Sequence, residues 1–549
     1  MGRGTGMATT AIEGAPPQAA KVTRAGWYAL VLVSAAQAMS LLDRQILSIL
    51  APSIRADLGI GDSELGLLYG TVFALFYALF SLPLGRLVDG WVRTRLLAIC
   101  IAAWSFSAGL AAFAGGFALL AVSRLGVGVG EAAAQPAANS IIFDTFPRSR
   151  RGTAMAAMGV ATALGLGLSM ALGGVVAQWW DTRYAAGSAP LGFSGWQFAF
   201  LVAAAPGLLL AWLIYRMREP LRGQMDGIAT VEDPHPFRAS AAVLGAVTPG
   251  ANWFMLWHRK AGARQWATNL AGLAVILAAC WIMVGVTQDF SPRPPLKALG
   301  LTIDPHVLQW FVVGFGAFVI LNLFQSFKLT DKPTYNVVLS PSLILLMVVG
   351  GLQTSINYGV MGFTPSFLIG KFGLSPAETG LQFGLLAAAL GIVGPVVAGP
   401  LSDWLTARMG ARGRVWLTIF SLGVSPLFGI WTYSAEDPAS FYLRFVGYSL
   451  ILTLWLPPLY SLLYDLVLPR MRGITSSTYI IVSTLLGLGM GPYFVGIVSD
   501  QNGGDLGQAI ISINLVVPAI VVCLLIVLLR INRDEATMIE RARAGGEPV

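Results

Sequence analysis

Residues Leu119 to Pro136 read LLAVSRLGVGVGEAAAQP, an apolar helical stretch that carries Arg124 and Glu131. Seven residues separate the two charges, so at about 100° per residue they return to nearly the same face of a helix, about 10 Å apart along its axis. Every second residue from 126 to 130 is glycine, which allows close packing. A charged side chain costs about 2.5 to 3.5 kcal/mol at the middle of a membrane helix and by default faces a partner or a wet cavity. The stretch therefore predicts a functional site inside a membrane.

The composition of the whole chain supports this interpretation. Hydrophobic residues make up 56% of the 549 residues and charged residues only 11%, whereas soluble domains carry about 25% charged residues. We therefore predict an all-α polytopic membrane protein. The net charge of +8 lies in short segments between apolar runs, which favours membrane orientation over a nucleic-acid partner. The three cysteines lie in apolar runs without metal spacing, so we expect no metal and no cofactor apart from a proton gradient.

Fourteen apolar stretches are long enough to cross a hydrocarbon core of about 30 Å. They lie near residues 26–51, 65–88, 95–114, 117–143, 153–178, 194–215, 266–287, 307–326, 342–370, 379–400, 415–433, 441–466, 474–498 and 508–530. Arginine and lysine concentrate in the loops on one side of these stretches, the side that also holds both chain ends. This asymmetry predicts a multi-pass protein of the bacterial inner membrane with both termini in the cytoplasm.

The two ends of the chain repeat one another at an offset between 314 and 322 residues. The repeated positions include Gly85 and Gly399, Asp89 and Asp403, Arg124 and Arg444, Asp144 and Asp465, Arg151 and Arg472, and Gly165 and Gly487. The repeat implies two six-helix halves of the same orientation, separated by an insertion with two further helices. The domains predicted in order are a disordered cytosolic tail (1–24), a first bundle (25–218), a linker with the inserted pair (219–339), a second bundle (340–531) and a cytosolic tail (532–549).

A charged motif follows the second predicted helix. Gly85-Arg86-Leu87-Val88-Asp89 precedes Arg93 and Arg95, and we interpret it as a latch, because Asp89 can pair with an arginine in one conformation and release it in another. The alternative is an ordinary interfacial charge cluster, but the recurrence of the motif at residues 399–403 favours the latch. The predicted cytosolic gate consists of Gly85, Asp89, Arg93, Arg95, Asp144, Arg151, Gly399, Asp403, Asp465 and Arg472.

The Gly-x-Leu-x-Asp pattern with basic residues after it resembles the signature of the major facilitator superfamily. Two further stretches, LLDR at 41–44 and SRLGVGVGEA at 123–132, look most like the spinster family of lipid-related transporters. The anion-cation symporter branch shares a looser form of both. The chain departs from the pattern at Gly90, where a basic residue commonly follows the aspartate, and in its two extra helices. The resemblance implies two six-helix bundles around a central cavity that opens to alternate faces.

In that family the acid of the first helix and the arginine and glutamate of the fourth are linked to proton coupling and translocation. These map to Asp43, Arg124 and Glu131, and Arg44 is the fourth embedded charge. Counting 1.5 Å per residue along the two helices puts Asp43 and Arg124 in the outer half of the membrane, with Glu131 nearer the cytosol. The alternative is that an Asp43–Arg124 or Glu131–Arg44 bridge merely fixes helix packing.

The candidate substrate cavity is lined from the second half. A polar cluster precedes Pro365, and aromatic residues flank the Pro457-Pro458 break in the twelfth span. These side chains either contact substrate or make interhelical hydrogen bonds and packing contacts. The predicted cavity residues are Gln353, Thr354, Asn357, Tyr358, Trp455 and Tyr460.

We predict a proton-coupled secondary active transporter that moves an amphiphilic or lipid-like organic solute by alternating access. A symporter of a small organic carboxylate, with Arg124 or Arg44 as counter-ion, is the alternative. A membrane receptor or scaffold that kept the fold without transport is the alternative from another class. An enzyme is disfavoured, because the apolar runs contain no nucleophile and base pair. We expect a monomer in contact with membrane lipids, with the inserted helices available as a partner interface.

Overall fold

The computed structural model describes residues 22–147, 150–184, 188–222, 224–225, 234–298, 301–468 and 471–547. The predicted N-terminal tail lies almost wholly outside the described residues. Fourteen helical spans within the described ranges are long and apolar enough to cross a membrane. Each overlaps one of the fourteen predicted stretches over most of its length, so the all-α polytopic fold is confirmed.

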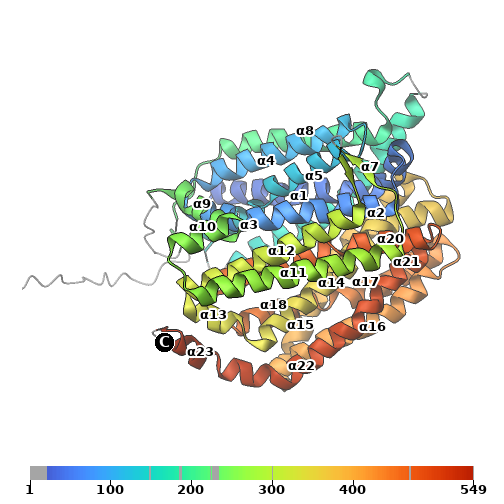
Figure 1. Ribbon diagram of the computed structural model, residues 1–549. Helices are drawn as coiled ribbons and strands as arrows, with labels where there is room; N and C mark the ends of the chain where they lie inside the picture. The colour runs from blue at the N-terminus through green and yellow to red at the C-terminus, as the bar shows by residue number, and fades with distance from the viewer. Residues whose placement is uncertain are drawn as a thin grey trace, which may run out of the picture.

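The first six spans form the first bundle (Figure 1). Their helices are α1 (Arg24–Leu58), α2 (Asp62–Gly66) continued through a π-helical turn (Leu67–Thr71) into α3 (Val72–Gly90), α4 (Arg93–Leu110) with a 3-10 turn (Ala111–Phe113), α5 (Phe117–Glu131) followed by α6 (Ala134–Thr145), α7 (Arg151–Arg183), and α8 (Gly195–Tyr215) after a 3-10 turn (Pro190–Gly192).

The insertion follows the first bundle. It comprises α9 (Pro236–Val247), α10 (Ala251–His258), the spans α11 (Ala263–Phe290) and α12 (Pro305–Thr330), and α13 (Lys332–Val338). Between the two spans, β1 (Leu296–Ala298) pairs antiparallel with β2 (Leu301–Ile303) and forms a short β-hairpin after the Pro-rich segment 291–295. Asp304 begins α12 by accepting hydrogen bonds from the N–H groups of His306 (2.7 Å) and Val307 (3.1 Å).

The last six spans form the second bundle. They are α14 (Pro341–Phe372), α15 (Pro376–Met409), α16 (Ala411–Tyr433), α17 (Pro438–Thr453) followed by α18 (Leu456–Asp465), α19 (Arg472–Ser483) continued through a π-helical turn (Thr484–Leu488) into α20 (Gly491–Gln501), and α21 (Leu506–Ser512) continued through a 3-10 turn (Ile513–Val516) into α22 (Val517–Ala536). The segment predicted as a C-terminal tail is helical, because α22 runs to Ala536 and α23 (Met538–Ala544) follows.

The spans run roughly parallel, and the molecule has two ends (Figure 1). The end at which α9, α10, α13 and α23 lie also holds both ends of the described chain, and we term it the terminal face. The end that carries the β-hairpin is termed the hairpin face. Because fourteen spans are an even number, the described chain begins and ends at the same face.

Glycines at the hairpin face bring the two bundles into backbone contact. A Cβ atom on Gly66 would lie 2.7 Å from the Pro492 carbonyl oxygen, and one on Gly174 would overlap the Pro376 carbonyl. Gly380 meets the Met170 carbonyl in the same way. Only glycine permits this approach, so α2 packs on α20 and α7 on α15 at this end of the molecule.

Glycines of the terminal face behave differently. A Cβ atom on Gly85, Gly159 or Gly399 would meet no atom of the described residues of neighbouring elements within 4 Å. Gly85 and Gly399, two members of the predicted gate, therefore make no close helix contact with the described residues in this conformation. The described contacts between the bundles are thus tighter at the hairpin face than at the positions of these three glycines.

Candidate functional site

A buried ion pair links the first helix to the fourth span. Arg44 Nη2 donates to Glu131 Oε2 at 2.6 Å, with the Arg44 side chain 11% exposed and that of Glu131 fully buried. The guanidinium carbon of Arg44 lies 4.6 Å from the ring centroid of Phe73 and 5.2 Å from that of Tyr77. The Tyr358 hydroxyl accepts a further hydrogen bond of 3.3 Å from Arg44 Nη1. The Glu131–Arg44 bridge considered from the sequence is therefore present, in contact with both bundles.

Arg124 binds the backbone of α1 instead of the Asp43 side chain. It is fully buried, and its guanidinium donates to the carbonyl oxygens of Asp43 (2.9 Å) and Arg44 (3.3 Å). The carbonyl of Leu42 accepts another hydrogen bond, of 2.9 Å, from Ser169 Oγ. Three consecutive carbonyls of α1 thus bind side chains of neighbouring helices. The alternative Asp43–Arg124 side-chain bridge is absent from these described contacts.

The Asp43 carboxyl group is buried without a hydrogen-bond partner. The residue is 1% exposed, and among the described residues neither side-chain oxygen makes a hydrogen bond. The indole nitrogen of Trp104, fully buried in α4, also has none. A charge buried without a partner is costly unless it is neutralised. The site therefore combines one buried ion pair, one arginine bound to backbone carbonyls and one buried carboxyl group without a hydrogen-bond partner among the described residues.

The fourth span is broken directly after Glu131, which corrects the prediction of one helix from Leu119 to Pro136. Residues 132–133 form a turn between α5 and α6. Pro136 explains the break, since it lacks the N–H that would bond the Ala132 carbonyl, and its ring crowds that carbonyl. Both Arg124 and Glu131 remain in α5. The break places the Glu131 side chain at a helix end inside the bundle.

The twelfth span is broken at the equivalent position. Residues 454–455 separate α17 from α18, 322 positions after the turn in the fourth span. Pro458 stands four residues after Leu454 and removes the corresponding hydrogen bond. Trp455 is 3% exposed in this turn. The repeat detected in the sequence therefore extends to an interruption in both halves.

One of the predicted cavity residues contacts the charged site, and the other five do not. Tyr358 contacts Arg44, as described above. The side chains of Gln353 and Asn357 bond one another at 3.2 Å, and Thr354 Oγ1 donates back to the Gly350 carbonyl. Trp455 is buried in its turn, and the ring of Tyr460 packs on those of Tyr464 and Tyr479. Gln353 nevertheless keeps one buried oxygen without a partner.

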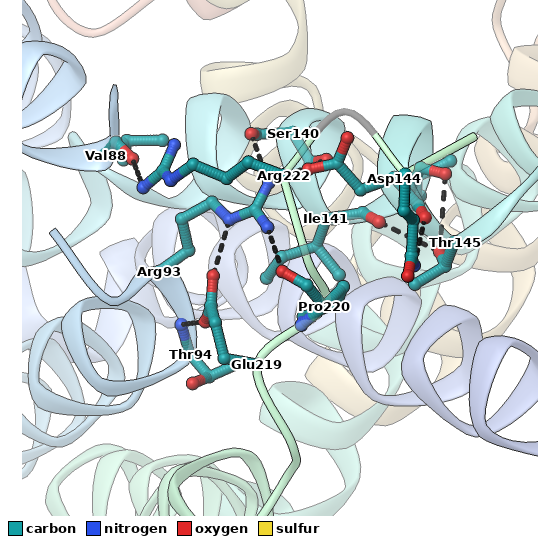
Figure 2. Close-up of polar contacts among 12 residues, drawn as sticks. Val88, Arg93, Thr94, Ser140, Ile141, Asp144, Thr145, Glu219, Pro220 and Arg222 are labelled. Carbon is teal, nitrogen blue, oxygen red and sulfur yellow. Dashed lines mark hydrogen bonds and ion pairs between the residues drawn. The ribbon is translucent and has the colours of Figure 1, made fainter. Parts of the chain in front are cut away.

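Arg93 organises the terminal face of the first bundle (Figure 2). Its side chain is fully buried and pairs with Asp144 and, at 2.7 Å, with Glu219 Oε1. It also donates to Ser140 Oγ at 2.8 Å and to the Pro220 carbonyl at 2.7 Å. These contacts join α4, α6 and the segment after α8 into one unit.

The remaining gate residues of the first copy are less constrained. Asp89 and Arg95 are exposed, and the Asp89 carboxylate makes no hydrogen bond or ion pair to the residues described. Arg222 donates to the Val88 carbonyl at 2.6 Å (Figure 2). Burial, and then the positive charge of Arg93, lower the pKa of Arg222 from its ordinary value. The side chain of Arg151 lies outside the described residues.

The second copy of the gate repeats the ion pair with less burial. Arg414 pairs with Asp465, and their side chains are 16% and 42% exposed. Both residues lie 321 positions after Arg93 and Asp144. Asp403 is exposed, and the side chain of Arg472 lies outside the described residues.

Sequence reasoning missed several residues that the structure brings to these sites. Tyr69, Phe73 and Tyr77 recur every four residues on the second span, a spacing that predicts one helix face. Phe73 and Tyr77 hold Arg44, and Tyr69 bonds Gln45 of α1. Arg414 follows from the repeat when the offset of 321 is applied to Arg93. No comparable sequence pattern indicated Glu219 or Trp104.

The sequence pattern of the Major Facilitator Superfamily matches residues 33–352, more than half of the chain. The chain belongs to this superfamily. It is therefore a multi-pass membrane transporter and not an enzyme, which confirms both predictions.

Relatives within the superfamily differ in what they are named for. An MFS-type efflux pump of Mycolicibacterium smegmatis is 23% identical over 485 residues, which cover 88% of this chain and 87% of the pump. Protein spinster of Drosophila melanogaster is 27% identical over 40% of this chain and 35% of its own. A probable L-galactonate transporter of Escherichia coli is 27% identical over 55% of this chain and 66% of its own.

Solved superfamily structures show the same fold. A bacterial homologue of the human lysosomal transporter spinster, inward-facing and unoccupied, superimposes with a TM-score of 0.62 at 21% identity, covering 95% of this chain and 99% of the homologue. The occupied form of that homologue gives 0.61. The resemblance to the spinster family is thus confirmed.

Proposed function

We propose that this superfamily member is a proton-coupled secondary transporter of an amphiphilic or lipid-like organic solute that works by alternating access. It lies in the inner membrane with both termini in the cytoplasm, so that the terminal face is the cytosolic one. The proposal rests above all on the buried Asp43 carboxyl group, whose two oxygens make no hydrogen bond among the described residues.

Proton exchange at Asp43 has a physical reason. An ionised carboxylate without a partner is strongly disfavoured in an apolar interior, and protonation removes its charge. Water that reaches the site in one conformation would favour release of the proton. A conformation that excludes water would favour its uptake, so protonation and conformation are linked at this residue.

The Arg44–Glu131 pair supplies the second element of coupling. A proton on Glu131 would remove the negative charge that holds Arg44 and would weaken the 2.6 Å contact between α1 and α5. Arg44 also contacts Tyr358 of the second bundle, so its release would change a contact between the bundles. Asp43, Arg44, Arg124 and Glu131 accordingly act together, with Arg124 as the fixed member bound to backbone carbonyls.

The surroundings of Arg44 favour an amphiphile over a small carboxylate. Both arginines are already engaged, Arg44 by Glu131 and two aromatic rings and Arg124 by α1. An apolar cavity of about 330 Å³ lies between α1, α7 and α8, and its lining includes Leu42, the neighbour of Asp43 in sequence. A hydrocarbon chain fits such a lining, whereas a sugar acid would need hydrogen-bonding partners there.

The efflux-pump relative supports a transport function, because the match covers 87% of that protein, but its name gives no substrate. Relatives named for sugar acids match shorter parts of this chain, 55% for the probable L-galactonate transporter. Because of these relatives, a small carboxylate is the second candidate substrate.

Flux into liposomes tests the proposal. The purified protein is reconstituted with a pH-sensitive dye inside, and movement of a fluorescent lysophospholipid and of labelled L-galactonate is followed with and without an imposed pH gradient. We expect gradient-dependent lysophospholipid movement with coupled proton flux, lost in Asp43→Asn and kept in Glu436→Gln, an exposed acid at the hairpin face. Movement of L-galactonate alone would favour the second candidate, and flux that ignores the gradient would refute proton coupling.

A further inference from the structure

The inserted helix pair touches both bundles where they meet. We propose that it is a clamp that holds the hairpin face closed, with Arg293 as its gating residue, and that it thereby sets the balance between the two conformations of the transporter. The clamp is defined as Arg293 and the α12 residues His306, Gln309, Val319 and Leu323. The inference rests on the proposed alternation of conformations, but on no particular substrate or coupling ion.

Arg293 binds one carboxylate from each bundle. It follows α11, before the β-hairpin, and its guanidinium pairs with Asp500 of α20 and lies 3.7 Å from Glu64 Oε2 of α2. The side chains are largely withdrawn from water, with 16% of Arg293, 14% of Asp500 and 5% of Glu64 exposed. Moving Asp500 away from Glu64 must break at least one of these contacts.

The acids at this contact need a cation. Asp500 accepts hydrogen bonds from the N–H groups of Asp62 (3.3 Å) and Ser63 (2.9 Å). These bonds place the Asp500 carboxylate of the second bundle close to the acids of α2 in the first. Asp62 Oδ2 accepts from Ser499 Oγ at 3.0 Å. Three acids therefore meet, and among the described residues the arginines that pair with them are Arg55, at 2.8 Å from Asp62, and Arg293. Without Arg293, like charges on α2 and α20 would repel one another.

Deeper in the membrane, α12 bonds both bundles again. The side-chain oxygen of Gln309 lies 2.5 Å from Thr71 Oγ1 of the first bundle, and its Nε2 donates to the Gly489 carbonyl of the second at 3.0 Å. His306 Nδ1 lies 2.5 Å from the Tyr493 hydroxyl. All these groups are buried, so their separation would leave polar atoms without partners.

Apolar packing continues the contact toward the terminal face. Val319 and Leu323 of α12 form one buried cluster with Ala78 and Leu79 of α3 and with Ile481 and Leu485 of the second bundle. The inserted helix therefore follows the junction of the bundles along most of its length. A peripheral spacer would contact one bundle alone.

Distances between spin labels test the clamp. Labels are attached to cysteines replacing Arg183 and Glu436, both exposed at the hairpin face, one in each bundle, after the three native cysteines are changed to alanine. We expect Arg293→Gln to raise the ratio of separated to closed populations at least about fivefold. Arg293→Lys, which keeps the charge, should restore most of the closed population. Arg259→Gln, an exposed arginine of the insertion at the terminal face, is the matched control and should change nothing.

A second set of variants separates the clamp from a folding defect. Asp500→Asn keeps the oxygen that accepts backbone hydrogen bonds but loses the charge, and it should open the hairpin face as Arg293→Gln does. The double variant should add little to either single change, because both remove the same pair. Equal distance distributions in wild type, Arg293→Gln and Asp500→Asn would overturn the clamp. Absence of substrate flux in the wild type, together with the expected distance shifts in the variants, would refute the proposed function and leave the clamp supported.

Discussion

The Arg44 guanidinium lies 2.6 Å from the fully buried Glu131 carboxylate, and the same guanidinium donates a hydrogen bond to Tyr358 of the other bundle. One side chain thus connects a charge inside the first bundle to the junction of the two. We therefore expect neutralisation of Glu131 to change contacts inside the first bundle and also at the junction of the two bundles.

Glu131→Gln should abolish gradient-driven transport and leave exchange measurable. The amide still accepts a hydrogen bond but carries no charge, so the variant should lose about 1 to 3 kcal/mol of stability. Transport is measured in liposomes with and without a gradient, and stability by thermal unfolding. Unaltered driven uptake would remove Glu131 from the coupling scheme.

Asp43→Asn should have the opposite effect on stability. The wild-type carboxyl group is buried and makes no hydrogen bond among the described residues, so a neutral amide of the same shape gives up no hydrogen bond and removes a buried charge. We expect thermal stability equal to or above that of the wild type, together with loss of coupled proton flux. A clear fall in the unfolding temperature would mean that the Asp43 carboxylate is held by interactions in the folded protein.

Arg93→Gln and Arg414→Gln form a matched pair. Arg93 is fully buried between Asp144 and Glu219, so its loss removes a buried positive charge and two ion pairs and should cost about 3 to 5 kcal/mol. The Arg414 pair is partly exposed, and its loss should cost less than about 1 kcal/mol. Unfolding temperatures of both variants in one detergent compare the two, and equal losses would contradict the difference in burial.

Gly380→Ala should disturb the closed hairpin face, because the added methyl group overlaps the Met170 carbonyl of α7. We expect a loss of about 1 to 3 kcal/mol and a longer label distance between the bundles. Gly391→Ala on the same helix is the control, since its Cβ would lie 3.7 Å from that of Ala163, an ordinary contact. If both variants unfold at one temperature, close backbone packing between α7 and α15 does not stabilise this conformation.

The fourteen spans and the two bundles were predictable, because long apolar runs and a repeated charge motif depend on sequence alone. The partners of the buried charges were not. Whether Arg124 meets the Asp43 carboxylate or the α1 carbonyls depends on the distance between α1 and α5, which side-chain packing decides. The break after Glu131 had a local signal in Pro136, but the alanines between them favour helix.

The role of Arg293 could not be predicted from the sequence either. In the sequence it stands in a Pro-rich connection far from both Glu64 and Asp500, and its charge resembles that of any loop residue. Only the packing of α12 between the bundles brings the three together. Patterns along one helix therefore allowed predictions from the sequence, whereas contacts among three separate segments could not be predicted.

The unequal burial of the two repeated ion pairs has a mechanical consequence. The Arg93 pair fastens the terminal face of the first bundle into a stiff block, whereas water and salt reach the Arg414 pair and weaken it. Each bundle has its own copy of this ion pair, but the two bundles therefore differ in stiffness at the terminal face. Rising ionic strength at the terminal face should therefore loosen the second bundle more than the first.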